Sequence, residues 1–557
     1  MAKPVIAVDF GTSTILVAIR TSPEDPDPTI PIGEVTHWMP SLVGVDQDGT
    51  WVYGEEADRL PPSQVIRSIK TSLGANEETV SIERPSGNTL SLKVDDLILG
   101  LLGEALARAR NRAAPNVKLH LDPPFRIHMC CPADWTSEPR LRLERIVSRA
   151  GLKASVDEIV DEPIAAGISW VMGNYGSEGE FPGGRTLVFD CGGGTLDVAV
   201  IDVTLSEGAS APEINVLSAG ALNLAGDYLD DRIFEKLWPK LSDAERSGTL
   251  SDAEVEQLAK RAARELKHLL SDSDEASVRI PGLREAVRYT RPELEKAFQP
   301  QLNKAIKFAF TMIRTSLIRN REVAYGRIRA MKQKKLAAGI DHILLSGGMS
   351  HIPLIREELK RQFGREPMAD PFLTDPEKSV ISGLTYEDAV ASLNLHRPGF
   401  DFVAEFFDRN GTRVGKQVLY AAFTPFYRWP EPFLRNTDLG FETVLEPPPG
   451  AESVKVICMT ATGKRVPLQI QGTGQNKIEL ELDPKPVNPK NQRFKLYVDG
   501  RLVIRAGSQE LLLDIPKWPH LGAGQPDAVI ASRRDPRQGW WGLNDPIEGL
   551  RRTHRRW

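Results

Sequence analysis

The feature that most constrains this fold is a glycine turn that occurs twice, each time after an apolar strand that ends in aspartate. The first copy is VIAVDFGTSTILVAIR at residues 5–20, and the second is TLVFDCGGGTLDVAVIDV at residues 186–203. Glycine permits a sharp turn and lets main-chain N–H groups approach an anion. Aspartate beside such a turn can hold a hydrated Mg²⁺. Two copies so far apart in the chain predict two similar lobes that grip one nucleotide phosphate tail.

Neither turn follows the commoner nucleotide-binding patterns. Neither is a P-loop of the form G-x-x-x-x-G-K-[ST], and neither is a Rossmann turn of the form G-x-G-x-x-G. A single hairpin of this kind is also typical of an ordinary β-turn. The repetition of the whole pattern favours a phosphate site.

The composition describes an ordinary globular protein, with 41% hydrophobic and 26% charged residues. The 557 residues suffice for about two to four domains. A net charge of −5 gives no support for nucleic-acid binding. The cysteines at 130, 131, 191 and 458 lack zinc-site spacing, which predicts buried thiols in a reducing compartment. We see no signal-peptide pattern and no apolar run near the roughly 18 residues of a membrane span, so we expect a cytoplasmic protein without a membrane partner.

Strand and helix patterns alternate through residues 1–395, which predicts an α/β domain of two lobes. We place lobe I at about 1–184 and lobe II at about 185–395. The Gly-rich segment 173–184 is the expected connection between them.

Several helices are expected within these lobes. Amphipathic periodicity predicts helices at Val94–Ala113 and Ser137–Leu152, the second with Ser137 as its N-cap. In lobe II, Asp227–Leu336 is expected to be largely helical, and residues 342–364 read as strand, glycine turn and helix.

The last third of the chain has a different residue pattern. Short strand-like runs separated by turns predict a small antiparallel β-rich domain at 396–520. An extended tail is expected at 521–557, where Arg and Trp residues are interspersed after residue 533. Such a tail is typical of a poorly ordered segment, of a docking peptide for a partner, or of an arm packed on the core. Contact with nucleic acid is a further alternative that we do not favour.

The order and spacing of further motifs carry a family resemblance over about the first 395 residues. DFGTST and DCGGGTLD resemble the two phosphate loops of the 70-kDa heat-shock (DnaK-type) chaperones, within the actin-like ATPase superfamily. VIRSIKTSLG resembles the segment with the catalytic lysine of that family, DEPIAAG its "NEPTAA" region, and SGGMSHIP its adenosine motif. The resemblance implies a two-lobed α/β ATPase domain with ATP and Mg²⁺ in the central cleft, followed here by a β-rich region and a basic, Trp-containing tail.

Residue roles follow from the matched positions. The resemblance implies a hydrolytic site of Lys70, Glu162, Asp190, Asp197 and Thr195. Mg²⁺ would be held through water by Asp9 and Asp190. ATP or ADP would be contacted by Asp9, Gly11, Thr12, Ser13, Thr14, Gly192, Gly193, Gly194, Gly226, Lys267, Ser271, Gly347, Gly348, Met349 and His351. Phosphoryl transfer needs this mixture of cation, water-orienting groups and oriented amides.

The chain departs from the family in two places. On the adenosine side, Arg264 replaces a glutamate, Met349 a serine and His351 an arginine, so we expect weaker adenine affinity and relaxed base choice. The join at Ser392–Phe402 lacks the acidic, leucine-rich linker of the family, and no long lid helix follows. The resemblance therefore does not extend to the peptide cleft or to coupling with a J-domain partner.

These observations support a chaperone-like ATPase that slowly hydrolyses Mg·ATP. Its nucleotide state would control a C-terminal β-rich domain that binds a protein or peptide client, and a co-chaperone is a further possible partner. The alternative is a nucleotide-binding scaffold or interaction protein with little turnover. A polymerising actin-like protein is a third reading, which the additional helical stretch and the appended β domain disfavour.

Overall fold

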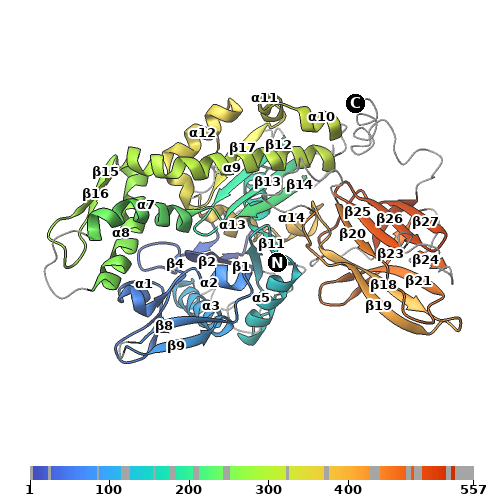
Figure 1. The fold of residues 1–557 in the computed structure, drawn as a ribbon, viewed down its shortest axis with the longest axis horizontal. Coiled ribbons are helices and arrows are strands. Elements are labelled where there is room, and N and C mark those ends of the chain that lie inside the picture. The colour runs from blue at the N-terminus through green and yellow to red at the C-terminus, as the bar shows by residue number, and fades with distance from the viewer. Residues whose placement is uncertain are drawn as a thin grey trace.

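The computed structural model describes residues 4–22, 25, 27–84, 87–114, 126–154, 158–175, 183–204, 212–242, 251–320, 325–368, 376–426, 440–471, 478–481, 492–521 and 528–533. These residues form two α/β lobes, one above the other in Figure 1, with a β-rich region beside them. The expected lobe connection at 173–184 and the Arg/Trp tail fall mostly outside the described residues.

Lobe I is built on a mixed sheet with the strand order β11-β10-β1-β2-β3 and with β4 beside β2. The first glycine turn joins β1 to β2, which are antiparallel, while β10 lies parallel to β1 on its other side. The strands of this sheet are β1 (Val5–Phe10), β2 (Thr14–Arg20), β3 (Thr29–Ile30), β4 (Met39–Pro40), β10 (His128–Cys131) and β11 (Val160–Asp161).

Helices of different lengths and two small sheets complete lobe I. They are α1 (Glu55–Asp58), η1 (Pro62–Gln64), α2 (Ile69–Gly74), α3 (Val94–Arg112), α5 (Ser137–Arg149), and the strands β5 (Val43–Val45), β6 (Trp51–Tyr53), β7 (Val65–Ile66), β8 (Thr79–Glu83) and β9 (Thr89–Lys93). The expected N-cap was wrong by one residue: Thr136 holds the extended N-cap position of α5, and Ser137 is its first helical residue.

Lobe II repeats the plan of lobe I with a sheet in the order β14-β13-β12-β17. The second glycine turn joins the antiparallel strands β12 and β13, and β17 lies parallel to β12. These strands are β12 (Gly184–Cys191), β13 (Leu196–Thr204), β14 (Glu213–Leu222) and β17 (His342–Ser346).

Helices surround the sheet of lobe II. They are α7 (Gly226–Ser242), α8 (Asp252–Asp272), α9 (Arg291–Arg319), α10 (Tyr325–Ala330), α11 (Gln333–Ala337), η4 (Gly348–His351), α12 (Pro353–Phe363) and α14 (Glu387–Ala391). The helical expectation for 227–336 was incomplete, because an antiparallel hairpin of β15 (Glu275–Val278) and β16 (Val287–Thr290) separates α8 from α9.

Two helices pack against each other where the lobes meet: α6 (Glu162–Tyr175) and α13 (Lys378–Gly383). A Cβ atom on Gly383 would lie 1.8 Å from the Ala165 carbonyl oxygen, so only glycine allows this close approach. The segment after α13 also reaches lobe I, because Arg20 of β2 donates a 2.8 Å hydrogen bond to the Thr385 hydroxyl.

The C-terminal region consists of two sheets, in the orders β19-β18-β21-β22, with β24 beside β21, and β20-β25-β26-β27-β28-β23. Their strands are β18 (Phe400–Phe407), β19 (Arg413–Tyr420), β20 (Gly440–Val444), β21 (Ser453–Thr460), β22 (Arg465–Val466), β23 (Leu468–Ile470), β24 (Ile478–Glu481), β25 (Arg493–Tyr497), β26 (Arg501–Ala506), β27 (Gln509–Asp514) and β28 (Val529–Arg533). The expectation of an antiparallel domain was wrong in one place, because β23 and β28 are parallel. Strand β28 also lies beyond residue 520, within the segment expected to be an extended tail.

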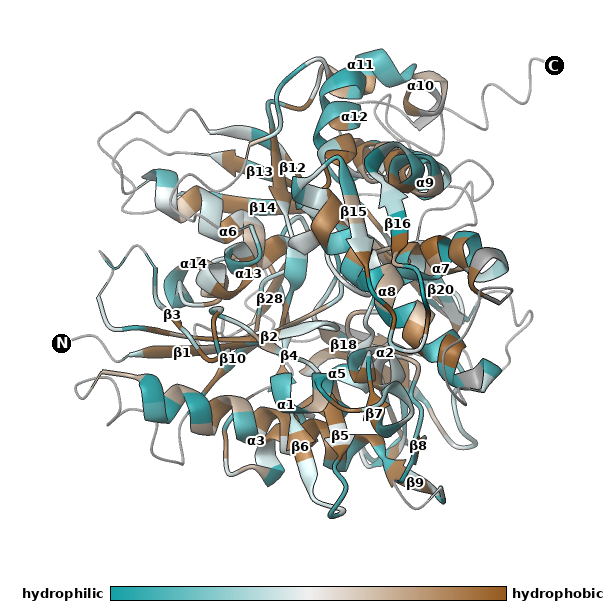
Figure 2. Cartoon of the chain, turned by 90° about the vertical axis from the view of Figure 1, so that its left-hand side faces the viewer, coloured by the Kyte–Doolittle hydropathy of each residue, from teal (hydrophilic) through white to brown (hydrophobic). Residues whose placement is uncertain are grey.

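The hydrophobic interior follows the central strands of the lobes. In Figure 2, β1 and β13 have the brown of hydrophobic residues, while α3 and α8 carry both brown and teal segments. One apolar cluster fills lobe I, and a second runs from lobe II into the β-rich region. No helix among the described residues combines the length and the apolar character needed to cross a bilayer.

Candidate active site

The two glycine turns have the same backbone geometry. In the first, the Gly11 N–H donates a 2.9 Å hydrogen bond to the Thr14 carbonyl. In the second, the Gly192 N–H donates a 3.0 Å hydrogen bond to the Thr195 carbonyl. The sequence repeat is therefore a structural repeat, and each turn follows the strand that carries Asp9 or Asp190.

The two turns face each other across the cleft between the lobes. A Cβ atom on Gly193 would lie 1.9 Å from the Ser13 hydroxyl oxygen, and one on Gly194 would lie 2.5 Å from the Thr12 hydroxyl oxygen. The glycines of lobe II are thus required because the turn of lobe I approaches their backbone. This cradle gathers backbone N–H groups and hydroxyls in one place, as an anion site requires.

Lys70 lies beside the first turn, near the start of α2. Ser68, two residues before Lys70, has a left-handed backbone with φ of 52°. Its hydroxyl donates a hydrogen bond to the Asp227 carboxylate of lobe II. The Lys70 ammonium is 3% exposed and forms an ion pair with Glu162, the first residue of α6. Burial disfavours its charge, but Glu162, Cys130 and Asp9 outweigh this and raise the pKa of Lys70.

Carboxylates outnumber cations around this lysine. Burial raises the pKa of Asp9 to about 6, opposed by Lys70, and raises that of Asp190 to about 8, with Glu162 and Asp9 adding to the shift. Burial and then Glu162 raise the pKa of Asp197. Because these groups lie in a buried space with one neighbouring ammonium, the donor set fits a divalent cation.

Asp197 is positioned from lobe I and lobe II together. One of its carboxylate oxygens accepts a 2.7 Å hydrogen bond from the Ala133 N–H. Its other oxygen, Oδ2, is buried and has no hydrogen-bond partner among the described residues. The Thr195 hydroxyl lies beside the same carboxylate. An unsatisfied acceptor at this point is consistent with a cation or a water molecule in the cleft.

The start of α7 supports the second turn. The Gly226 N–H donates to the Gly192 carbonyl at 3.2 Å, and the Asp227 N–H donates to the Gly193 carbonyl at 2.7 Å. Lys267 of α8 donates to the Gly226 carbonyl at 3.3 Å and lies 2.8 Å from a carboxylate oxygen of Asp230. Lys267 is therefore already engaged by its own lobe.

Of the remaining residues of the adenosine side, Gly347 lies against the Asp190 carboxylate, since its Cβ would lie 2.6 Å from Asp190 Oδ1. A Cβ atom on Gly347, whose φ is 79°, would lie 2.4 Å from the Cys191 carbonyl oxygen, so this turn packs directly on the end of β12. Gly348 begins η4, Met349 is buried in the core, and the His351 ring is 43% exposed with Nε2 3.7 Å from Glu377. The Ser271 hydroxyl donates to the Lys267 carbonyl of its own helix.

Some participants were missed in the sequence. The Cys130 thiol donates a 3.3 Å hydrogen bond to Asp9, and Asp230 pairs with Lys267. Asp230 lies one helical turn after Gly226 and could have been found from that spacing. The role of Cys130 could not be predicted, because the sequence of an apolar strand does not show which side of the sheet its cysteine faces.

The two α/β lobes with facing glycine turns are of the class that contains the nucleotide-binding domain of the Hsp70 proteins. The family model described as Hsp70 protein matches residues 126–394. The chain is thus similar to the Hsp70 proteins over this part of its length.

Curated relatives show the same similarity. The chain is 25% identical over 429 residues to "Chaperone protein DnaK" of Thermotoga petrophila. The aligned region covers 76% of this chain and 65% of the relative. It is 24% identical over 430 residues to "Chaperone protein DnaK" of Thermosipho melanesiensis, which covers 76% of this chain and 64% of the relative. The chain thus matches slightly less than two thirds of the length of these relatives.

Proposed function

We propose that the cleft binds Mg·ATP and hydrolyses it slowly. The observation that carries this proposal is the meeting of both glycine turns with Lys70, Glu162 and the aspartates in one buried space. Asp9 and Asp190 would hold Mg²⁺ through its water shell, and the bound ion would neutralise charge on the phosphate oxygens. The backbone N–H groups of the turns and the hydroxyls of Thr12 and Ser13 would hold the phosphates.

The remaining groups have distinct roles in this proposal. Lys70 stabilises the charge that develops on the transferred phosphoryl group, and the ion pair with Glu162 fixes its ammonium near the turns. Glu162 and Asp197 orient the attacking water. Thr195, beside Asp197, contributes a hydroxyl at the same end of the site.

We further propose that the nucleotide state is transmitted to the β-rich region. The segment that joins lobe II to the β-rich region runs along the edge of lobe II, because the Val216 N–H donates a 2.8 Å hydrogen bond to the Asn394 carbonyl. The Leu395 N–H in turn donates a 2.8 Å hydrogen bond to the Trp518 carbonyl of the β-rich region. A change in the angle between the lobes would move this join, so the β-rich region is the proposed site for a protein or peptide client in the cytoplasm.

A nucleotide-holding scaffold with little turnover is the second candidate. The exposed His351 and the buried Met349 favour it, because they leave few side-chain groups on the base side. The Lys70–Glu162 pair opposes it, because a site that only holds a nucleotide has no need of this pair.

Single-turnover hydrolysis of Mg·ATP by the full chain, beside Lys70→Ala and Glu162→Ala, separates these functions. An ATPase predicts that turnover falls by about 10²-fold or more in both variants while ATP still binds. Tight binding without turnover in all three proteins would establish the scaffold. If the unmodified chain does not bind ATP, both candidate functions are overturned.

A further inference from the structure

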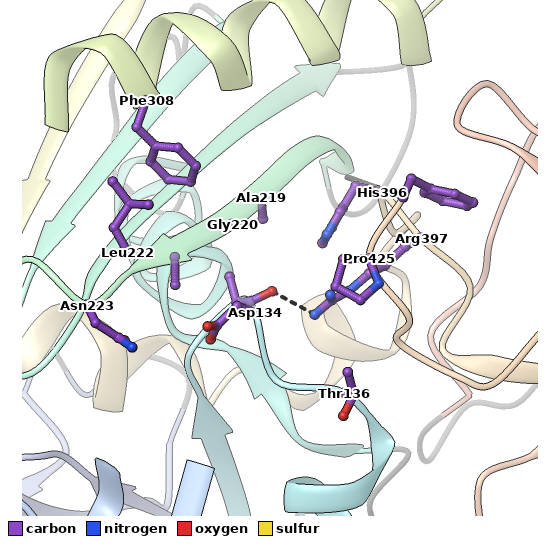
Figure 3. A pocket seen from close by; sticks show the side chains of 13 residues that line it. Asp134, Thr136, Ala219, Gly220, Leu222, Asn223, Phe308, His396, Arg397 and Pro425 are labelled. Atoms are coloured by element: carbon purple, nitrogen blue, oxygen red, sulfur yellow. Dashed lines mark hydrogen bonds between the residues drawn. The ribbon is translucent and has the colours of Figure 1, made fainter. Parts of the chain in front are cut away.

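A second cavity, of about 380 Å³, lies at the junction of lobe I, lobe II and the β-rich region. The loop after β10 contributes Asp134, α9 contributes Phe308, and the join contributes His396 and Arg397. Figure 3 shows the His396 ring and the Asp134 carboxylate directed into the same space. The volume is within the range of small-molecule sites, and the residues proposed to contact nucleotide do not line it.

The inner wall of the cavity carries buried nitrogens without partners. His396 is 5% exposed, and neither of its ring nitrogens has a hydrogen-bond partner in the described part of the chain. The Nε of Arg397 is likewise buried and unpartnered, while its Nη2 donates a 2.7 Å hydrogen bond to the Ala133 carbonyl. Buried donors of this kind are normally satisfied, so they call for a ligand that supplies acceptors.

Positive charge is concentrated at the same inner wall. Arg397 lies 3.7 Å from Asp161, but this carboxylate is also bonded to the fully buried Arg140. Two buried guanidinium groups thus share the Asp161 carboxylate. Burial, with Arg397, Arg319 and Arg140 nearby, lowers the pKa of His396, so its ring is neutral and presents one N–H donor and one acceptor.

A carboxylate lies beside these guanidinium groups, because Arg397 donates to the carbonyl of Ala133, the residue before Asp134. Asp134 is exposed at the rim, and no side chain donates a hydrogen bond to its carboxylate among the described residues. Phe308, Leu222 and Phe426 also line the cavity, and each of them is buried. The cavity therefore offers buried donors, a carboxylate close to them and an apolar wall.

We propose that this cavity binds a free α-amino acid with an apolar side chain. The ligand carboxylate would accept from His396 and Arg397, its ammonium would face Asp134, and its side chain would lie against the aromatic wall. The carboxylate and the ammonium of such a ligand lie on one carbon atom, so it satisfies the neighbouring cationic and anionic groups at once, whereas a simple amine or a simple acid satisfies one. This binding does not depend on ATP hydrolysis.

The test is isothermal titration calorimetry of the full chain with three matched probes. L-phenylalanine carries both charges, 2-phenylethylamine lacks the carboxylate, and 3-phenylpropanoate lacks the ammonium. We expect L-phenylalanine to bind at least tenfold more tightly than either analogue, since each missing charge-assisted hydrogen bond costs affinity. Equal affinity for the three probes, or no binding of L-phenylalanine, would overturn the proposal.

Asp134→Asn sharpens the test, because this exposed residue can change without disturbing the core. The variant should lose at least fivefold in affinity for L-phenylalanine and keep its affinity for 3-phenylpropanoate. Glu158→Gln is the matched control, since Glu158 is another carboxyl of lobe I that lies beside an arginine, Arg126. If Glu158→Gln weakens binding as much as Asp134→Asn, the proposed contact with Asp134 is wrong.

Discussion

Each lobe contains a buried lysine–carboxylate pair beside its glycine turn, and the two pairs differ in what surrounds them. In lobe I, Lys70 and Glu162 are 3% and 13% exposed and lie next to Asp9 and Cys130. In lobe II, Lys267 and Asp230 are both 9% exposed, and Lys267 also bonds to the Gly226 carbonyl. The first pair is part of the carboxylate cluster, whereas the second braces the backbone behind the second turn.

This difference shows that the same ion pair can serve two purposes within one repeated plan. The position of Lys70 among buried carboxylates suits it to stabilise charge on a phosphoryl group. Lys267 has its charge matched by Asp230, and Arg264 lies 3.7 Å from the same carboxylate. We therefore expect the lobe I pair to govern hydrolysis and the lobe II pair to govern the stability of the turn.

The largest expected effect comes from removing each lysine in turn. Lys267→Ala leaves Asp230 buried without its closest cation, which costs about 3–5 kcal/mol for a broken buried pair, with Arg264 holding the loss near the lower value. We expect a clear fall in the midpoint of thermal unfolding, together with a single-turnover rate at saturating ATP within about fivefold of the unmodified chain.

Lys70→Ala should show the reverse pattern, with hydrolysis lowered by about 10²-fold or more. The two rates and the two unfolding midpoints are measured on the same preparations. Equal loss of hydrolysis in both variants would remove the distinction between the two pairs.

A smaller effect is expected from adding one methyl group to the second turn. In Gly194→Ala the new Cβ would lie 2.5–2.9 Å from three side-chain atoms of Thr12, and this β-branched residue has little freedom to move away. Overpacking of this kind costs about 1–3 kcal/mol, so we expect ATP affinity to fall by about 10- to 100-fold.

Gly192→Ala is the matched control for this change. Its Cβ would meet only the Thr195 carbonyl oxygen, at 3.4 Å. ATP affinity, measured by calorimetry, should change by less than about threefold. An equal loss in both variants would mean that the contact between the lobes does not set the affinity.

The smallest expected effect is a pH dependence in the lobe II pair. Burial, opposed by Lys267, raises the pKa of Asp230 from 3.8 to about 6 in the folded chain. The folded state therefore binds this proton more tightly than the unfolded state. The contribution of Asp230 to the free energy of unfolding is fully present below about pH 4 and is lost as the pH rises to about 6.

Asp230→Asn removes this titration. The slope of the free energy of unfolding against pH should become less negative by at most about 1.4 kcal/mol per pH unit between pH 4 and 6. Urea denaturation of lobe II across this range measures the slope. An unchanged slope would show that Asp230 has the same pKa in the folded and unfolded chains.

The sequence allowed the local parts of the cleft to be predicted and left their assembly open. The turns at Gly11 and Gly192 were readable because strand alternation and glycine chemistry are local. Lys70 and Glu162 were found through the family motifs, since neither carries a signal of its own. Asp230 and Cys130 were missed because a buried partner depends on which face of a helix or strand turns inward.

Elsewhere, long-range packing overruled the local pattern. The parallel pairing of β23 with β28 joins segments that are separated by β24–β27, and nothing in either run of residues specifies this partner. The hairpin of β15 and β16 lies within a stretch whose charged residues read as helix. In both cases strand pairing and burial outweigh weak intrinsic propensity.

By itself, the sequence determined the repeated strand–turn–strand units, because strand periodicity and glycine conformation act over a few residues. Only the tertiary structure decided that Gly194 faces Thr12, that α6 and α13 touch at Gly383, and that His396 and Asp134 share one cavity. These relations join residues far apart in the chain, and they are set by how the lobes and the β-rich region pack together to bury apolar surface.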